Sequence, residues 1–413
     1  MTPLLIWAIA AASIAGILFR PRQWPEAVWA CLGALLLVCF RLISVSAAAF
    51  ALLKGTGVYL FLGGMMLLAD LARREGVFDW MASHAVHASR GSCARLFLLV
   101  YAVGILVTVF LSNDATAVVL TPAVYAAVRR ARAAAEPYLF ACTFIANAAS
   151  FVLPISNPAN LVVYGRSLPP LLPWLRAFAL PSLASIGVTF LALLVFFRKP
   201  LGGTVEPHTA AVTLTPSGIR AVWAIAFTGA VLITASALGL NLGLPTCISA
   251  VLAVLTATRA RLHAAWDVAR EVSWSVLPLV AGLFVLVEGM NHAGASAALA
   301  TAFSRLQTLP RPIAALAASF GVTALSNLMN NLPSGLLVGS AVQTAHIPPH
   351  LRDAVLIGID LGPNLSVTGS LATVLWLIAL RREGHRVAGL TFLKCGFVTM
   401  SPALLLATLA LLA

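Results

Sequence analysis

Residues 357–376 read IGIDLGPNLSVTGSLATVLW. The stretch begins and ends as an apolar helix, but Gly362-Pro363-Asn364 and Thr368-Gly369-Ser370 interrupt it. Proline lacks an amide donor and glycine frees the backbone, so we expect no continuous helix here. Inside a membrane every unpaired backbone group costs several kcal/mol, and a broken helix persists only where it lines a cavity or binds something. The stretch therefore predicts a polar site at a helix break.

The composition places this break in a membrane. Of 413 residues, 61% are hydrophobic and only 9% are charged, and the mean hydropathy is +0.98. A soluble domain would carry about a quarter of its residues as charged side chains. Apolar runs of about twenty residues recur, the length of a membrane-spanning helix, and the short alternating segments of a β-barrel are not seen. The sequence predicts an all-α polytopic membrane protein.

The net charge of +13 fits the same class. The basic residues lie in short loops beside apolar runs, which is typical of cytoplasmic loops and does not indicate nucleic acid. Six cysteines are scattered without a CxxC spacing, so neither a disulfide framework nor a soft-metal site is indicated. The first apolar stretch, 3–19, lacks a basic n-region and a cleavage site, and we expect it to be a retained helix.

The apolar runs fall into two halves with the same order. The halves predict two inverted repeats, residues 1–199 and 217–413, joined by a linker at 200–216. Each repeat is expected to hold five transmembrane helices and a re-entrant hairpin, with broken helices at the midplane; hairpin arms that cross fully are the alternative. Basic loops would then lie in the cytoplasm and both termini outside. The expected segments are 3–20, 25–40, 44–70, 72–93, 95–111, 115–129, 137–165 and 171–197, then 218–238, 242–258, 272–290, 293–308, 312–328, 332–345, 352–380 and 387–411.

Four polar breaks occur as matched pairs, at the two hairpin tips and in the two interrupted runs. A single Asn or Pro in a membrane helix is usually an interhelical contact or a kink, but matched clusters in both halves are typical of a transporter's binding site. We expect the two pairs to meet. The candidate substrate-binding residues are Asn113, Asp114, Ser156, Asn157, Asn160, Asn330, Asn331, Gly362, Asn364, Thr368 and Ser370.

Two carboxylates within this set are candidates for proton coupling. Asp114 lies at the first tip and Asp360 opens the second interruption. A carboxyl group removed from water can load and release a proton near neutral pH. Asp114 is equally a candidate N-cap of the second hairpin arm. Lys54 lies deep in its run and needs a carboxylate partner or a water-filled cavity.

Motifs of other classes are missing from the sequence. It contains no HExxH, GxSxG or Walker A segment, so neither an intramembrane enzyme nor an intrinsic ATPase is indicated. We expect no metal and no cofactor. A channel is the remaining rival, but two carboxylates at a repeat interface favour a coupled carrier.

Three segments carry a family resemblance: SNDATAVVLTP at 112–122, SNLMNNLPS at 326–334, and IGIDLGPN with TGSLATVLW at 357–364 and 368–376. They resemble the arsenite efflux permeases of the ArsB type. That family belongs to the ion transporter superfamily, which also holds sodium/proton antiporters and sodium/dicarboxylate carriers. Two positions depart from the family's pattern: Asn364 stands where the motif has lysine, and Pro158-Ala159 replaces a more aliphatic pair.

The resemblance implies a multi-pass protein of the bacterial inner membrane. Such permeases export arsenite and antimonite as neutral trihydroxides in exchange for protons, and some members have a soluble arsenite-stimulated ATPase as partner. On this hypothesis hydroxyl and amide groups at the four breaks hold As(OH)3 while Asp114 or Asp360 exchanges a proton. A sodium/proton antiporter or an anion/dicarboxylate symporter of the same superfamily is the alternative, although dicarboxylate carriers show Ser-Asn-Thr at both tips.

Overall fold

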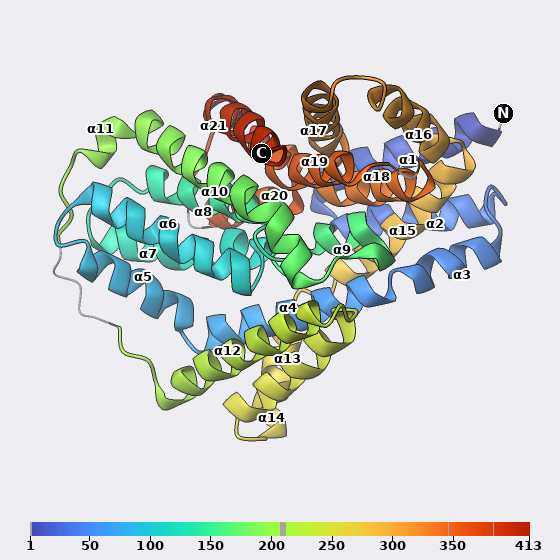
Figure 1. Ribbon diagram of the computed structural model, residues 1–413. Helices are drawn as coiled ribbons and strands as arrows, with labels where there is room; N and C mark the ends of the chain where they lie inside the picture. The colour runs from blue at the N-terminus through green and yellow to red at the C-terminus, as the bar shows by residue number, and fades with distance from the viewer. Residues whose placement is uncertain (1, 207–211, 346, 383) are drawn as a thin grey trace.

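The computed structural model describes residues 2–206, 212–345, 347–382 and 384–413, and they form an all-helical protein (Figure 1). Within these residues, six helices are long and apolar enough to cross a membrane, or up to seven if the bent pair α14 and α15 is one span. They are α4 (Thr56–Arg74), α6 (Cys93–Phe110), α10 (Leu171–Phe196), α12 (Pro216–Ala237), α17 (Arg311–Met329) and α21 (Gly389–Ala410). The protein is therefore a polytopic, multi-pass membrane protein.

This number is smaller than the sequence suggested because several apolar helices are short. Glu26–Cys39 and Gly243–Ala257 are apolar but have fewer than 18 residues. The run expected at 44–70 is two helices, α3 (Val45–Lys54) and α4, divided at Gly55. A Cβ at Gly55 would overlap the hydroxyl oxygen of Tyr59, so a larger residue at this break would displace the Tyr59 side chain.

The first half follows the predicted order of segments. Its remaining helices are α1 (Thr2–Phe19), α2 (Glu26–Cys39), α5 (Val77–Ala88), α7 (Thr121–Arg130), α8 (Glu136–Ala148) and α9 (Pro158–Tyr164). Short turns η1 (Pro21–Gln23) and η3 (Gly165–Ser167) and helix α11 (Arg198–Leu201) complete it. The second hairpin arm starts as a π-helical turn, η2 (Ala115–Leu120), and α8 and α9 are separated by the interruption expected in 137–165.

The second half repeats this order. Its remaining elements are α13 (Gly243–Ala257), α14 (Leu262–Glu271), α15 (Val276–His292), α16 (Ala295–Leu306), α18 (Asn331–Ala345), α19 (Pro349–Leu361), η4 (Gly362–Leu365), η5 (Val367–Gly369) and α20 (Leu371–Arg382). The interruption expected in 352–380 is present as the two 3₁₀ turns between α19 and α20. Helix α14 was not expected; it meets α15 at an angle of 48°.

The helices pack in two groups. In the crossing bundle (α1–α4 and α12–α15), α2 packs against α15 and α4 packs against α13. Both crossings are close because a Cβ at Gly64 would lie 2.8 Å from the Thr246 carbonyl oxygen, and a Cβ at Gly282 would lie 2.7 Å from the Ala30 carbonyl carbon. Small residues let membrane helices approach in this way.

The other group, the break bundle (α6–α10 and α17–α21), holds all the predicted breaks. In it α10 packs against α21, α17 against α19, and α9 against α18. Along the chain, α5 and α16 connect the crossing bundle to the break bundle. The two bundles also touch directly, because α15 packs against α18 and α4 packs against α9. The fold thus gathers both broken helices and both hairpins in one bundle (Figure 1).

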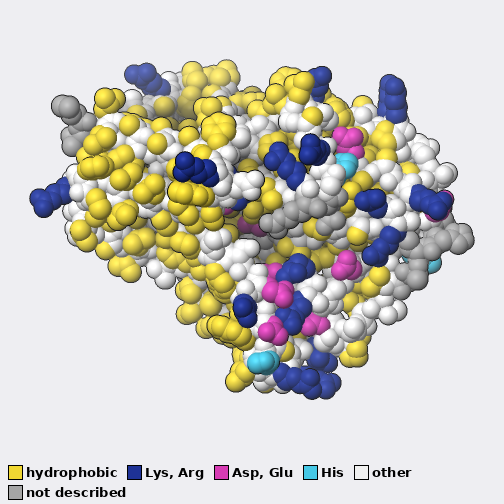
Figure 2. All heavy atoms as spheres, turned by 180° about the vertical axis from the view of Figure 1, so that it is seen from behind, with side chains coloured by type: hydrophobic (Ala, Val, Ile, Leu, Met, Phe, Trp, Pro, Cys, Tyr) yellow, Lys and Arg dark blue, Asp and Glu magenta, His cyan; other side chains and the backbone are white. Residues whose placement is uncertain are grey.

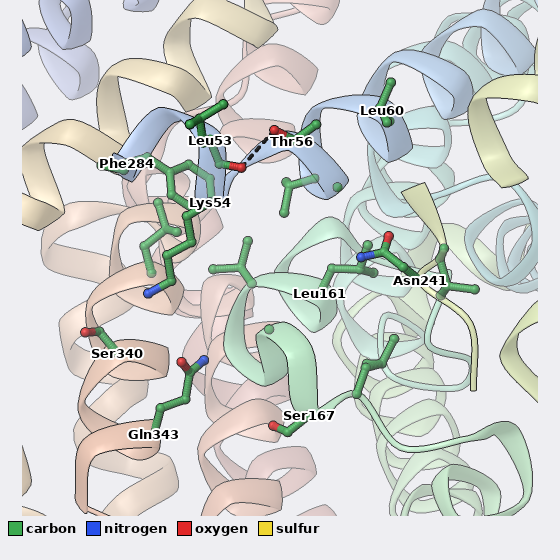
Figure 3. Close-up of a pocket in the computed structure, with 18 of the residues that line it drawn as sticks. Leu53, Lys54, Thr56, Leu60, Leu161, Ser167, Asn241, Phe284, Ser340 and Gln343 are labelled. Atoms are coloured by element: carbon green, nitrogen blue, oxygen red, sulfur yellow. Dashed lines mark hydrogen bonds between the residues drawn. The ribbon is translucent and has the colours of Figure 1, made fainter. Parts of the chain in front are cut away.

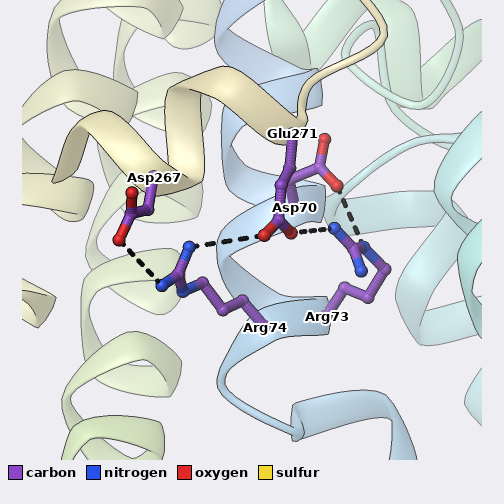
Figure 4. Close-up of polar contacts among 5 residues, drawn as sticks. All are labelled: Asp70, Arg73, Arg74, Asp267 and Glu271. Carbon is purple, nitrogen blue, oxygen red and sulfur yellow. Dashed lines mark hydrogen bonds and ion pairs between the residues drawn. The ribbon is translucent and has the colours of Figure 1, made fainter. Parts of the chain in front are cut away.

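The surface divides into apolar and charged regions. Figure 2 shows hydrophobic side chains covering much of one face, as a lipid-facing surface requires. A charged cluster joins α4 to α14 (Figure 4): Arg73 contacts Asp70 at 3.0 Å and Glu271 at 2.6 Å, and Arg74 contacts Asp267 at 3.3 Å. These ion pairs fasten α14 to the end of α4.

Candidate functional site

The first hairpin tip packs on the first interruption. The backbone N–H of Asn113 donates to the Ser156 carbonyl at 3.1 Å, and the Ser156 hydroxyl donates to the Val109 carbonyl at 3.3 Å. The turn itself is closed by Ser112, whose hydroxyl accepts from the Ala115 N–H at 3.1 Å. Backbone groups released where α6 ends therefore find partners in the break between α8 and α9.

The second tip packs on the second interruption through Asn327. Its amide donates to the Gly362 carbonyl at 3.0 Å, and its side-chain oxygen accepts from the Ser366 hydroxyl at 2.6 Å. The Thr368 hydroxyl donates to the Asn327 carbonyl at 3.0 Å. At the tip, Asn330 has φ 76° and ψ 151°, a conformation that L-residues rarely adopt.

Three amide side chains then join the halves. The Asn157 amide donates to Asp360 Oδ1 at 2.9 Å, while Asn157 Oδ1 caps α9 by accepting from the Ala159 N–H at 3.0 Å. The Asn147 amide donates to Asn364 Oδ1 at 2.9 Å, and the Asn364 amide donates to the Phe144 carbonyl at 2.9 Å. The structure thus links both interruptions to each other and each tip to its own interruption.

Two oxygen atoms of the Asn157, Asp360, Asn147 and Asn364 network lack a hydrogen-bond partner in the described part of the chain. Among the described residues, Asp360 Oδ2 and Asn147 Oδ1 are buried without a hydrogen-bond partner. Buried polar atoms are normally paired, so each exception calls for an explanation. Both atoms are acceptors, and Asp360 Oδ2 is an atom where a proton can bind.

The positions of Asn147 and Asp360 correspond. Helices α8 and α19 both have 13 residues, and Asn147 and Asp360 are each the twelfth. Asn147 and Asn327 were not among the candidates taken from the sequence, although both lie within polar clusters beside a break. The internal correspondence of the halves was the signal for Asn147.

Exposure separates the predicted residues into two groups. Asp114 and Thr368 are partly exposed, whereas the other predicted substrate-binding residues and Asp360 are buried. The Asp114 carboxylate makes no capping hydrogen bond within the described part of the chain, so the alternative of an N-cap is wrong. Ser112 closes this turn because its hydroxyl is the group that reaches the first free N–H.

Several predicted residues already have internal partners. The Asn160 amide donates to the Ser150, Leu153 and Pro154 carbonyls at 2.9, 3.3 and 3.4 Å. The Ser370 hydroxyl accepts from the Thr373 N–H at 3.1 Å. These side chains hold the interruptions in shape.

A cavity of about 1150 Å³ lies between the two bundles. Its wall includes Lys54, Asn241, Glu288, Asn291 and Ser340, and within the described residues it includes none of the predicted site residues. Figure 3 shows the Lys54 amino group pointing across the cavity toward α18. Of the two environments expected for Lys54, the cavity is the one found, since no ion pair of this lysine occurs in the described ranges.

Residues 5–359 match the family model described as a citrate transporter, which covers most of the chain. The chain belongs to the citrate transporter family. It is similar over 99% of its length to an arsenical pump membrane protein of Escherichia coli, with 27% identity and 98% of that protein covered. An arsenical pump membrane protein of Yersinia enterocolitica is 28% identical over 84% of each chain.

The fold of this citrate transporter family member also has a solved counterpart. The YdaH transporter of Alcanivorax borkumensis matches with a TM-score of 0.59 over 93% of this chain and 96% of that one, at 14% identity. The family and its relatives establish a secondary transporter of bacterial membranes and not an enzyme. The resemblance to arsenite permeases seen in the sequence is confirmed.

Proposed function

We propose that this protein exports trivalent arsenic, and antimonite, as the neutral trihydroxide in exchange for protons. The chemistry of the site carries the proposal. None of the predicted site residues is a lysine, arginine or histidine, and two of them are carboxylates. A citrate anion would meet negative charge without a cationic partner there, which costs free energy. A neutral triol needs only donors and acceptors, which hydroxyls, amides and carbonyls supply.

We further propose that the chain is two inverted repeats, 1–199 and 217–413, with 200–216 as linker. Reciprocal packing supports this. In the proposed repeats α2 corresponds to α13 and α4 corresponds to α15, and the structure packs α2 on α15 and α13 on α4. The equal lengths of α8 and α19 support it as well. In each repeat the hairpin, α6–α7 or α17–α18, would be re-entrant and bring its tip to the midplane.

The cavity beside Lys54 would open to the outside. With basic loops in the cytoplasm, the cavity-lining segments at 165–168 and 239–242 belong to external loops. On this topology the described conformation is open outward, and the ion pairs between α4 and α14 lie on the cytoplasmic side. A soluble arsenite-stimulated ATPase, as found with some arsenite permeases, would dock on that side.

The substrate would first meet the partly exposed groups. We assign Asp114 and Thr368 to that first contact. The buried residues of both interruptions would hold the backbone around them in shape. Asp360 would take a proton on Oδ2, the oxygen that Asn157 does not engage. Binding and release of this proton from opposite sides of the membrane would drive export.

Transport in everted vesicles tests the proposal. Vesicles from an arsenite-sensitive bacterium expressing the chain should accumulate As(III) when a pH gradient is imposed, and should not accumulate citrate. Asp360→Asn should abolish the effect of the gradient, and Asp114→Asn should reduce As(III) uptake. Asp79→Asn, at an exposed position of α5, is the matched control and should behave as wild type.

The alternatives have their own signatures. Sodium-dependent proton movement without As(III) uptake would replace the proposal with a sodium/proton antiporter. Gradient-driven citrate uptake would replace it with a symporter of citrate. Normal coupling in both Asp114→Asn and Asp360→Asn would show that neither carboxylate carries the proton.

A further inference from the structure

Helix α9 packs against α18 and α19 of the break bundle and against α4 of the crossing bundle, but it is too short to hold its own position. It has seven residues, Pro158–Tyr164, and an isolated helix below about 12 residues is marginal even in favourable sequences. Its orientation must therefore come from its contacts. Side chains at both of its ends bind α19, and the two contacts are different in kind.

At the inner end, Asn157 binds Asp360 as described above. At the other end, the Tyr164 hydroxyl donates to Asp353 Oδ1. Arg352 adds to this contact: its guanidinium carbon lies 4.6 Å from the centre of the Tyr164 ring, and its Nε lies 3.5 Å from Asp353 Oδ1. Tyr164 is 1% exposed and Asp353 is 8% exposed. We call Tyr164, Arg352 and Asp353 the outer clamp.

The spacing of the two contacts fixes the register of the helices. Asn157 and Tyr164 are separated by the same interval as Asp353 and Asp360, and the pairs run in opposite order along the chain. Seven residues are about two helical turns, or about 10.5 Å of rise, so both carboxylates lie on one face of α19. A slip of α9 by one residue would break both contacts together.

We propose that the outer clamp positions Asn157 against Asp360, and so controls access to the coupling carboxylate. The inference rests on the proposed function for the role of Asp360, but the clamp itself can be tested without transport. Asn157 can serve Asp360 only while α9 keeps its register, because the same side chain also caps α9.

Proton exchange makes the clamp necessary. An ionised Asp360 accepts a charge-assisted hydrogen bond from Asn157, and a protonated Asp360 accepts a weaker one. When the proton binds, the inner attachment of α9 weakens while the outer clamp is unchanged. The clamp is then the attachment that returns Asn157 to Asp360 after the proton leaves. The groups around Asp353 are Tyr164, Arg352 and His350, and the side chain acting on Asp360 is Asn157.

Carbodiimide labelling of Asp360 tests the clamp in the purified full-length chain. Dicyclohexylcarbodiimide reacts with carboxyl groups it can reach in an apolar environment, and mass spectrometry reads each site. Tyr164→Phe should raise the labelling rate of Asp360 by about ten-fold or more, since a hydrogen bond to a charged group is worth about 1.5–3 kcal/mol. Labelling of Asp114, which the clamp does not touch, is the internal reference and should stay constant.

Tyr101→Phe is the matched control. Tyr101 is also a buried tyrosine whose hydroxyl has one protein partner, the Ile186 carbonyl at 2.7 Å, but it lies outside the clamp. It should leave Asp360 labelling unchanged. Arg352→Lys, which keeps the charge but removes the guanidinium from above the Tyr164 ring, should give an intermediate rate and serves if Tyr164→Phe does not fold.

A double-mutant comparison in transport then tests whether Tyr164 acts through Asp360 or only stabilises the fold. In vesicles, Tyr164→Phe should weaken the dependence of As(III) uptake on the pH gradient, and should have no further effect on that dependence in an Asp360→Asn background. Equal labelling of Asp360 in wild type, Tyr164→Phe and Arg352→Lys would overturn the proposal. Clamp-dependent labelling in a chain that moves no As(III) would leave the clamp standing and reject the proposed substrate.

Discussion

Asn364 makes the sharpest quantitative prediction, because both ends of its amide are engaged. The side chain is fully buried, accepts from Asn147 and donates to the Phe144 carbonyl. Asn364→Ala leaves the Asn147 amide and the Phe144 carbonyl without these partners. A buried group left unpaired costs about 1–3 kcal/mol, so the two groups together should cost about 2–6 kcal/mol.

Two companion variants divide this energy. Asn147→Ala/Asn364→Ala removes one of the two unpaired groups, and the pair should couple by about 1 kcal/mol; hydrogen bonds in bacteriorhodopsin average ~0.6 kcal/mol in such cycles. Asn291→Ala is the control, since its amide makes one bond, to Ser340 at 3.1 Å, at a partly buried position. It should cost less than about 1 kcal/mol.

Reversible unfolding in mixed micelles, with tryptophan fluorescence against the mole fraction of SDS, measures wild type, these three variants and Asn147→Ala, the single change that the coupling energy also requires. The reasoning fails if Asn364→Ala unfolds at the same SDS fraction as Asn291→Ala. It also fails if Asn364→Ala keeps wild-type stability and only raises the KM for As(III), because Asn364 would then be a substrate contact and not a link between the halves.

Other predictions follow from single contacts. Gly396→Ala should destabilise the second interruption by about 1–3 kcal/mol, because its Cβ would overlap the carbonyls of Asn364 and Leu365; Gly321→Ala, with open space around it, should not lower the unfolding midpoint in SDS. Asn330→Gly should match wild-type stability in the same assay because glycine adopts a positive φ without strain, whereas Asn330→Ala should cost about 1–3 kcal/mol. Arg73→Ala should cost at most about 1 kcal/mol in the same assay, since Arg73 and Glu271 are about half exposed. The charge exchange Arg73→Glu/Glu271→Arg should not recover the loss, because the new carboxylate would face Asp70 and the new guanidinium would face Arg74.

The sequence was sufficient for the breaks because their chemistry is local. Proline and glycine interrupt a helix wherever they stand, so the interruptions before Pro158 and at Gly362-Pro363 could be placed from residue types alone. The division at Gly55 was not predicted, although Lys54-Gly55-Thr56-Gly57 is a polar stretch inside the apolar run. Glycine is common inside membrane helices, so this stretch alone does not tell a break from a continuous span.

The partners within the site were equally beyond the sequence. Asn147 and Asn364 are 217 residues apart, and the sequence identified only one of them as a candidate. Exposure was also hidden: Asp114 and Asp360 look alike as intramembrane carboxylates, but one is partly exposed and the other is fully buried. Tertiary packing decides both, and residue type does not.

Asn147 and Asp360 show how the two proposed repeats can carry an amide in one copy and a carboxyl group at the same position in the other. The two residues occupy the same position of α8 and α19, and each bonds to the interruption of the other half. Two carboxylates here would both be removed from water, and an amide in one copy keeps the hydrogen bond without the charge. A proton arriving at Asp360 therefore alters a bond between the halves and not one within a half. In the proposed exchange, that makes the interface between the two halves the place where proton binding and substrate movement are linked.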